Sequence, residues 1–201
     1  MASSFTFRIQ NVYVMNRNKF LKSIMIGVGT FSIGFKGFPL SLNNSNQLMN
    51  EVSESKQLIP VIVKEEEGKQ QIVLGDHQTI KLTGKDTNNQ FTLIEQFNTP
   101  GMEIPLHVHS NEDEIFHVLE GELEVQIGSE IKRLNAGDLG FCPRGIPHSW
   151  KVVGESKAKV LLSIFPSGLE LLFNELAQLP PGEPDFTQVA EICAKYNIKF
   201  V

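Results

Sequence analysis

Short apolar runs separated by turn-forming residues make up the chain from residue 57 to residue 166. Within several runs apolar and polar residues alternate, as expected for strands with one buried face. The clearest runs, in chain order, are QIVLG, QTIKLTG, FTLIEQF, EIFHVLEG, ELEVQIG, HSWKVV and KVLLSIFP. Many short strands at regular spacing predict an all-β sandwich or barrel. No helix is expected before residue 167, and the alternation on both sides of Glu120 and Gly121 predicts a tight hairpin there.

The period of the apolar positions changes after Pro166. Two runs then follow the helical spacing of three and four residues. The first comprises Leu169, Leu172, Phe173 and Leu176, and the second, after Asp185, comprises Val189, Ile192 and Cys193. The segment PPGEP between them ends the first helix, because proline cannot continue one. We therefore predict two short C-terminal helices, packed on the outside of the barrel.

The N-terminal part has the layout of an export signal. Basic residues between positions 17 and 22 precede an apolar run over residues 24–35, and residues 41–56 are polar and without periodicity. The apolar run is shorter than the ~20 residues that span a bilayer, so a signal peptide is favoured over a membrane helix. A working signal implies a periplasmic or secreted protein. Otherwise the protein is expected in the cytoplasm, and an uncleaved segment would contact the membrane.

Three parts follow from these patterns. Residues 1–56 are a signal-like or anchor segment with a flexible linker, residues 57–166 form the barrel, and residues 167–201 form a helical extension. The net charge of -5 comes from scattered acidic residues, which argues against a nucleic-acid partner. Cys142 and Cys193 lack the spacing of a zinc or redox site and are expected to be free, buried thiols.

Four residues have the types and spacing of a metal site. His107 and His109 are two residues apart, so on an extended strand both imidazoles face the same side. Glu114 comes at the start of the next strand, and His148 follows the turn-forming segment CPRGIP. Three imidazoles and a carboxylate suit Fe, Mn, Ni, Cu, Co or Zn, and an octahedral ion would keep two positions open for substrate or oxygen.

The spacing of these residues resembles the two motifs of the cupin superfamily. The first runs Gly101, five residues, His107, one residue, His109, four residues, Glu114, six residues, Gly121. The second runs Gly137, five residues, Pro143, then Gly145 and His148, with Val152 where the family usually has Asn. The resemblance covers roughly residues 57–165 and implies a cupin double-stranded β-helix, a jelly-roll barrel. It also implies that His107, His109, Glu114 and His148 hold one divalent metal inside that barrel.

Two aromatic residues are candidates for a substrate pocket. Phe116 and Trp150 share strand parity with the nearest ligand, so both side chains are expected to line the cavity beside the metal. Such walls favour an apolar or aromatic small molecule. Ordinary core packing is the alternative interpretation for both, and it is the preferred one for Val118. His117 is expected to face away from the ligands, since it lies three residues from Glu114.

Among cupins, a small one-barrel chain with a helical tail is most similar to the quercetin 2,3-dioxygenase-like proteins. The resemblance implies an oxidoreductase that uses Fe, Mn, Ni or Cu rather than Zn to cleave a small enol or aromatic substrate with oxygen, with Glu114 as ligand and possible base. It also suggests a homodimer that meets through strands near the N-terminal side of the barrel or through the C-terminal helices.

Two other functions stay open at this point. One is a binding or sensing cupin in which the metal orients a small ligand without turnover, and the other is an isomerase or decarboxylase acting on a sugar or keto acid. Basic residues in the motif region, such as Arg133 and Lys151, fall at turns or opposite the ligands, so phosphorylated substrates are disfavoured.

Overall fold

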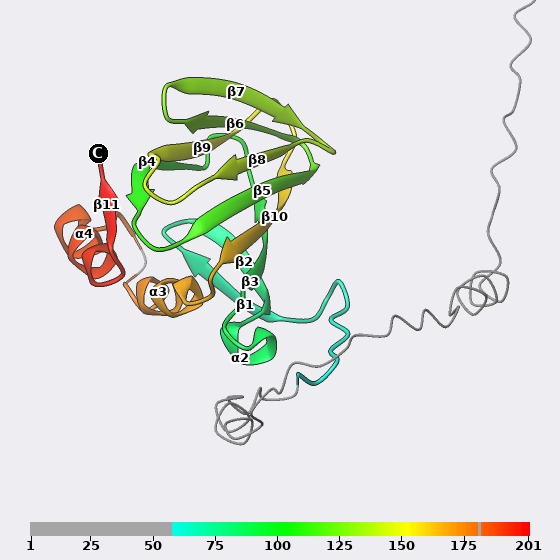
Figure 1. Cartoon of the computed structure of the whole chain (residues 1–201). Helices are drawn as coiled ribbons and strands as arrows, with labels where there is room; N and C mark the ends of the chain where they lie inside the picture. The colour runs from blue at the N-terminus through cyan, green and yellow to red at the C-terminus, as the bar shows by residue number, and fades with distance from the viewer. Residues whose placement is uncertain (1–57, 181) are drawn as a thin grey trace, which may run out of the picture. The chain divides into compact units, whose positions relative to one another are not determined.

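The computed structural model describes residues 58–180 and 182–201 (Figure 1). The expected signal-like segment, anchor and linker of residues 1–56 lie outside the described residues. Those that are described belong to one compact unit, Glu54–Val201. Within them, no helix has the length and apolar character needed to cross a membrane.

Six strands form the first antiparallel sheet, in the spatial order β1-β2-β3-β10-β5-β8. Their bounds are Lys69–Val73 (β1), Asp76–Leu82 (β2), Thr92–Asn98 (β3), Ala158–Phe165 (β10), Asp113–Glu120 (β5) and Leu139–Cys142 (β8). Along β10 every second residue is buried, and the same period of two holds along β3. Ile94 and Ile164 on these buried faces are 0% exposed, so this face of the sheet is core.

Five strands form the second antiparallel sheet, in the order β11-β4-β9-β6-β7. Their bounds are Ile198–Phe200 (β11), Glu103–His109 (β4), His148–Val153 (β9), Glu122–Ile127 (β6) and Glu130–Asn135 (β7). One core contains residues of both sheets, including Leu162 from the first and Val125 from the second. The all-β prediction is confirmed, and the strand pairing of the described residues gives a jelly roll of two sheets rather than one closed barrel.

The prediction of a hairpin at Glu120 and Gly121 is wrong. β5 ends at Glu120 in the first sheet, whereas β6 begins at Glu122 in the second, and the two strands do not pair. Gly121 has φ +73°, and a Cβ atom there would lie 2.5 Å from the carbonyl oxygen of Lys157. The glycine is therefore needed where the chain crosses from one sheet to the other.

A short helix, α2 (Gly84–Thr87), corrects the expectation of no helix before residue 167. It is a single turn, which is too short to show the helical spacing of apolar residues in the sequence. At its start, Oδ2 of Asp86 accepts hydrogen bonds from the backbone amide of the N-cap residue Thr83 at 2.9 Å and from its hydroxyl group at 2.8 Å.

The C-terminal helices are present as α3 (Leu169–Leu176) and α4 (Phe186–Lys195). They contact β1, β11 and each other at one end of the sheets (Figure 1). Their apolar faces do not simply cover the outside of the barrel, because Leu172 and Val189 join the core and line the main cavity. The strand β11, which was not expected, anchors the chain end by pairing with β4.

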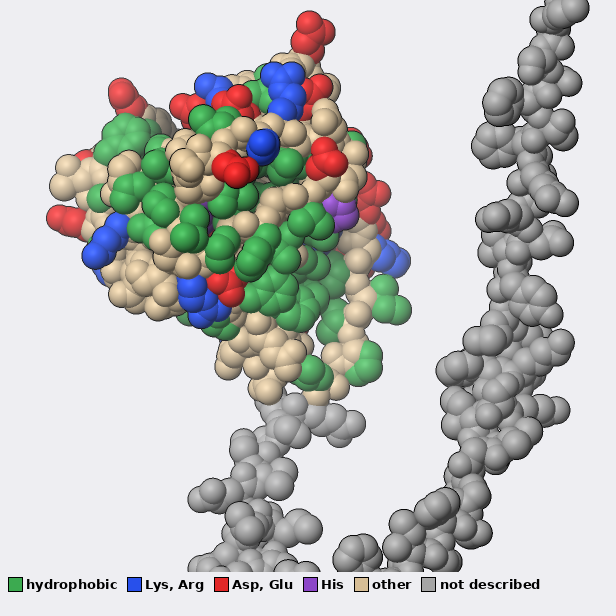
Figure 2. All heavy atoms as spheres, turned by 45° about the horizontal axis from the view of Figure 1, so that its top comes forward, with side chains coloured by type: hydrophobic (Ala, Val, Ile, Leu, Met, Phe, Trp, Pro, Cys, Tyr) green, Lys and Arg blue, Asp and Glu red, His purple; other side chains and the backbone are tan. Residues whose placement is uncertain are grey.

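Charges are mixed on the visible surface. In Figure 2, basic and acidic side chains interleave over the upper part of the face, and hydrophobic side chains gather below them.

Cys142 and Cys193 are free and buried, as expected.

Candidate metal centre and pocket

The structure brings together all four residues of the expected metal site. His107 and His109 come from β4, and His107 lies opposite His148, the first residue of β9, in the antiparallel pairing of the two strands. Glu114 comes from β5, so it approaches the imidazoles from the other sheet. One ligand atom from each residue lies within 4.8 Å of the others, and all four residues are buried. This cluster could hold one metal ion.

Backbone carbonyl groups orient two of the imidazoles. Nδ1 of His107 is 2.8 Å from the carbonyl oxygen of Pro105, and Nδ1 of His148 is 3.2 Å from that of Ile146. A carbonyl oxygen can only accept, so each Nδ1 carries the proton and each Nε2 is the nitrogen available to a metal. Nε2 of His148 lies 3.0 Å from Oε2 of Glu114.

The imidazole of His109 is held differently. Its Nδ1 is 3.5 Å from Oε2 of Glu112, and its Nε2 is 3.9 Å from Oε2 of Glu114. Among the described residues, neither nitrogen has a hydrogen-bond partner, although both are buried. A buried polar atom without a partner costs roughly 1–3 kcal/mol, and a divalent ion would remove that cost at Nε2. The residues present therefore fit a metal ion.

Glu112 is a residue of this site that the sequence interpretation missed. It is only 7% exposed, and its Oε2 also has no hydrogen-bond partner within the described part of the chain. Carboxylates beside the second ring nitrogen commonly orient metal-binding histidines. Its position three residues after His109 and two before Glu114 was the available signal.

The ionisation states of Glu114 and His107 suit metal binding, whereas for His109 the carboxylates of Glu114 and Glu112 outweigh burial and raise the pKa. Burial would raise the pKa of Glu114, but the imidazoles of His109 and His148 outweigh burial and lower that pKa to about 2. Burial, helped by repulsion from His148, lowers the pKa of His107 to about 4. Near neutral pH the carboxylate is therefore ionised and this imidazole is neutral, which are the forms that coordinate metals.

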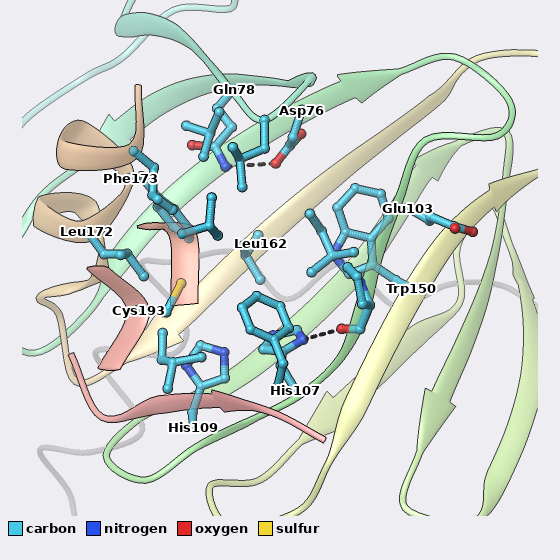
Figure 3. Close-up of a pocket in the computed structure, with 18 of the residues that line it drawn as sticks. Asp76, Gln78, Glu103, His107, His109, Trp150, Leu162, Leu172, Phe173 and Cys193 are labelled. Atoms are coloured by element: carbon cyan, nitrogen blue, oxygen red, sulfur yellow. Dashed lines mark hydrogen bonds between the residues drawn. The ribbon is translucent and has the colours of Figure 1, made fainter. Parts of the chain in front are cut away.

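A cavity of about 640 Å³ adjoins the cluster (Figure 3). Phe116 and Trp150 line it, at the positions expected from strand parity, whereas Val118 is 0% exposed and belongs to the core. Its other walls include Leu162 from β10, Phe173 from α3, Cys193 from α4 and Phe200 from β11. Among the described residues, the lining contains no Lys or Arg. His117 is not among the clustered or lining residues.

A second polar group in the cavity wall was also missed. Asp76, Gln78 and Gln96 line the cavity and are each less than 5% exposed. Oδ2 of Asp76 accepts hydrogen bonds from Nε2 of Gln78 at 2.7 Å and from Nε2 of Gln96 at 2.6 Å. Its Oδ1 accepts one from Nδ2 of Asn98 at 2.6 Å. Burial raises the pKa of Asp76 even though these hydrogen bonds oppose it.

Comparison with known proteins agrees with this fold. A family model described as a cupin domain matches residues 96–165, which include all four clustered residues. The chain is 34% identical over 107 residues to an uncharacterized protein of Aquifex aeolicus, an alignment that covers 53% of this chain and 79% of that protein. The chain belongs to the cupin superfamily.

Quercetin 2,3-dioxygenase of Bacillus subtilis is 30% identical over 97 residues, which cover 48% of this chain and 29% of that enzyme. The chain thus spans less than a third of the length of this relative. Among solved structures, KdgF from Halomonas sp. matches with a TM-score of 0.51 at 21% identity, over 56% of this chain and 99% of that one. A predicted oxalate decarboxylase from Thermotoga maritima matches with a TM-score of 0.50 at 22% identity, over 53% and 99%. At these identities the structural likeness concerns the fold alone.

Proposed function

We propose that this protein is a metal-dependent dioxygenase that acts on a small enol or aromatic substrate. The observation that carries the proposal is a buried cluster of three histidines and one glutamate that opens into a cavity with largely apolar walls. The quercetin 2,3-dioxygenase of Bacillus subtilis, a relative over about half of this chain, supports oxygen chemistry.

His107, His109, Glu114 and His148 would hold the ion. When bound, a redox-active ion such as Fe, Mn, Ni or Cu would supply Lewis acidity and the electron transfer that chemistry with dioxygen needs. Glu114 lines the cavity, so its carboxylate is near enough to a bound substrate to accept the proton that an enol or phenol loses. Phe116 and Trp150 give the substrate an apolar surface and exclude water from the reacting end.

Elemental analysis of the full-length chain, purified without added metal, is the first test. An oxygen electrode then measures uptake with flavonols and with smaller enols. About one Fe, Mn, Ni or Cu per chain together with oxygen uptake is the expected result. No metal, even after reconstitution, would overturn the metal site. Stoichiometric metal without uptake would overturn the dioxygenase and favour a cupin that binds a ligand without turnover.

An isomerase or decarboxylase acting on a phosphorylated sugar is less well supported. A phosphate group is normally bound by Lys, Arg or helix N-termini, and none of the described residues that line the cavity is Lys or Arg. The expected homodimer and the expected export both stay predictions.

A further inference from the structure

The cavity has two polar ends. In Figure 3, Asp76 and Gln78 lie at one side of the cavity and His107 and His109 at the other, with Leu162 between them. The strand register gives the scale of this separation. On β10, Ile164 pairs with Glu114 of β5, whereas Val160, four residues away, pairs with Gln96 of β3 on the other side. The two positions are four residues apart along the strand direction and two strand spacings apart across the sheet. The backbone of Glu114 therefore lies on the order of 15 Å from that of Gln96.

The polar group at the far end has unused hydrogen-bonding capacity. A carboxylate has about four acceptor positions, and the amides of Gln78, Gln96 and Asn98 fill three on Asp76. Among the described residues, Asp76 forms no ion pair with any Lys, Arg or His, and the carboxamide oxygen of Gln96 accepts no hydrogen bond. A donor or acceptor from a ligand could therefore add bonds here without breaking those already made.

A purely structural role does not explain these side chains well. The next inward row of the same sheet carries Ile80, Ile94 and Leu162, which are buried apolar residues. Apolar side chains in the row of Gln78 and Gln96 would complete the core without burying a carboxylate, which costs free energy unless it is fully paired. Polar side chains that face a cavity at this cost are typical of a binding site.

We infer that Asp76, Gln78 and Gln96 bind a hydroxyl group at the far end of the substrate. The inference rests on the proposed function for the near end, where the substrate meets the metal cluster. The substrate would be an elongated, mostly apolar molecule of two or three rings, with a hydroxyl group at the end remote from the metal. A hydroxyl group both donates and accepts, so it can serve the Asp76 carboxylate and a glutamine amide together. A carboxylate or phosphate at this end is disfavoured, because it would face Asp76, and the described part of the chain contributes no Lys or Arg to the cavity lining.

Fluorescence of Trp150 provides the readout, since it is the single tryptophan of the chain and lines the cavity. Two pairs of probes are titrated into the full-length protein, as purified and after metal removal. Flavone and 4′-hydroxyflavone differ only in the remote hydroxyl group, and 3-hydroxyflavone and 3,4′-dihydroxyflavone add a metal-chelating hydroxyl group to both. The variant is Gln96→Met, and the matched control is Gln126→Met on β6, where the glutamine bonds Gly128 and does not line the cavity.

In the wild type and in Gln126→Met, the member with the remote hydroxyl group should bind about five- to tenfold tighter. In Gln96→Met this preference should fall below about twofold. Gln78→Met serves the same purpose if thermal unfolding shows that Gln96→Met does not fold. Equal binding within each pair in the wild type, no quenching by either member, or a preference that survives both variants would overturn the inference.

Failure of the proposed function looks different. It would appear as a 3-hydroxyl group that adds no metal-dependent affinity and supports no oxygen uptake. The preference for the remote hydroxyl group, measured in the metal-free protein, does not depend on either of those results.

Discussion

Arg144 and Asp113 form a two-point ion pair that joins two of the three ligand-bearing segments of the metal cluster. Nε of Arg144 donates to Oδ1 of Asp113 at 3.0 Å, and Nη2 donates to Oδ2 at 2.7 Å. The backbone amide of Arg144 donates to Oδ1 as well, at 2.8 Å. Asp113 directly precedes Glu114, and Arg144 lies four residues before His148. The pair therefore ties the loop before His148 to the strand that carries Glu114.

Asp113→Asn should lower the free energy of unfolding by about 1 kcal/mol near neutral pH, because a paired, partly exposed carboxylate loses its charge. Hydrogen bonds from Arg144 lower the pKa of Asp113 to about 2. The pKa of Asp113 is about 3.9 in the unfolded chain and lower in the folded protein. The ion pair therefore stabilises the fold fully above about pH 4, and this stabilisation is lost as the pH falls toward 2. Urea unfolding between pH 7 and pH 2 should thus show a constant difference from the wild type that shrinks below pH 4.

The control for this change is Glu130→Gln. Glu130 and Lys132 form a pair with 4.0 Å between Nζ and Oε2, and both side chains are more than 70% exposed. Such a pair contributes little, so its loss should leave unfolding unchanged at every pH. A difference between wild type and Asp113→Asn that stays the same at pH 2 would contradict the role given to Arg144.

His109→Ala should abolish metal binding and also lower the stability of the metal-free protein, because it removes a buried imidazole that lies 3.5 Å from Oε2 of Glu112 and 3.9 Å from Oε2 of Glu114. Among the described residues the ring nitrogens of His109 have no hydrogen-bond partner, so this loss comes from packing and from the neighbouring carboxylates rather than from a hydrogen bond. In the wild type, metal at one hundred times its dissociation constant should add about 2.7 kcal/mol to the free energy of unfolding, and the variant should gain nothing. Elemental analysis and thermal unfolding with and without chelator measure both effects.

His117→Ala is the matched control, because His117 lies on β5 outside the cluster and outside the cavity lining. It should retain the metal content and the metal-dependent stabilisation of the wild type. Equal metal content in His109→Ala and His117→Ala would remove His109 from the ligand set.

Glu112→Gln should weaken metal binding about ten- to a hundredfold, which is the usual cost of losing a carboxylate that orients a metal-binding histidine. The carboxylate lies 3.5 Å from Nδ1 of His109, on the side of the ring away from the metal-binding nitrogen. Competition with a chromophoric chelator measures the affinity. Glu124→Gln on β6 makes the same charge change at an exposed residue and should have no effect. If the two variants bind metal equally well, Glu112 does not orient His109.

The resemblance to the two cupin motifs carried the prediction of the four ligands, and strand parity added the orientation of their neighbours. The spacing of His107 and His109 placed both on one face, and the same alternation placed Phe116 and Trp150 in the cavity lining. Parity does not say which face is inside, however. The inward polar positions of β2 and β3, Asp76 and Gln96 among them, have the pattern of a solvent-facing row, so the second polar end of the cavity was missed.

The pairing of strands that are distant in the chain was the other feature that the sequence pattern did not predict. Alternation before and after Gly121 is the same whether the two strands pair with each other or enter different sheets, and here they enter different sheets. The position of the C-terminal helices depends on β11, whose three residues pair with β4 and are too few to show a period. Both features follow from contacts between distant segments, which local pattern does not contain.

Cys193 should report directly on occupancy of the cavity. Its side chain lines the cavity, and burial raises the pKa of its thiol to about 11, so only about 0.1% is thiolate at pH 8. Alkylation by iodoacetamide should therefore be on the order of a hundredfold slower than for a free thiol, and should rise about tenfold per pH unit up to pH 10. A flavone bound in the cavity should slow the alkylation of Cys193 further. Cys142 is fully buried in β8, and burial raises the pKa of its thiol to about 12, so it should react slowly with or without the flavone. Peptide mapping by mass spectrometry distinguishes the two cysteines. Modification of Cys193 at the same rate with and without a bound flavone would mean that the flavone binds elsewhere.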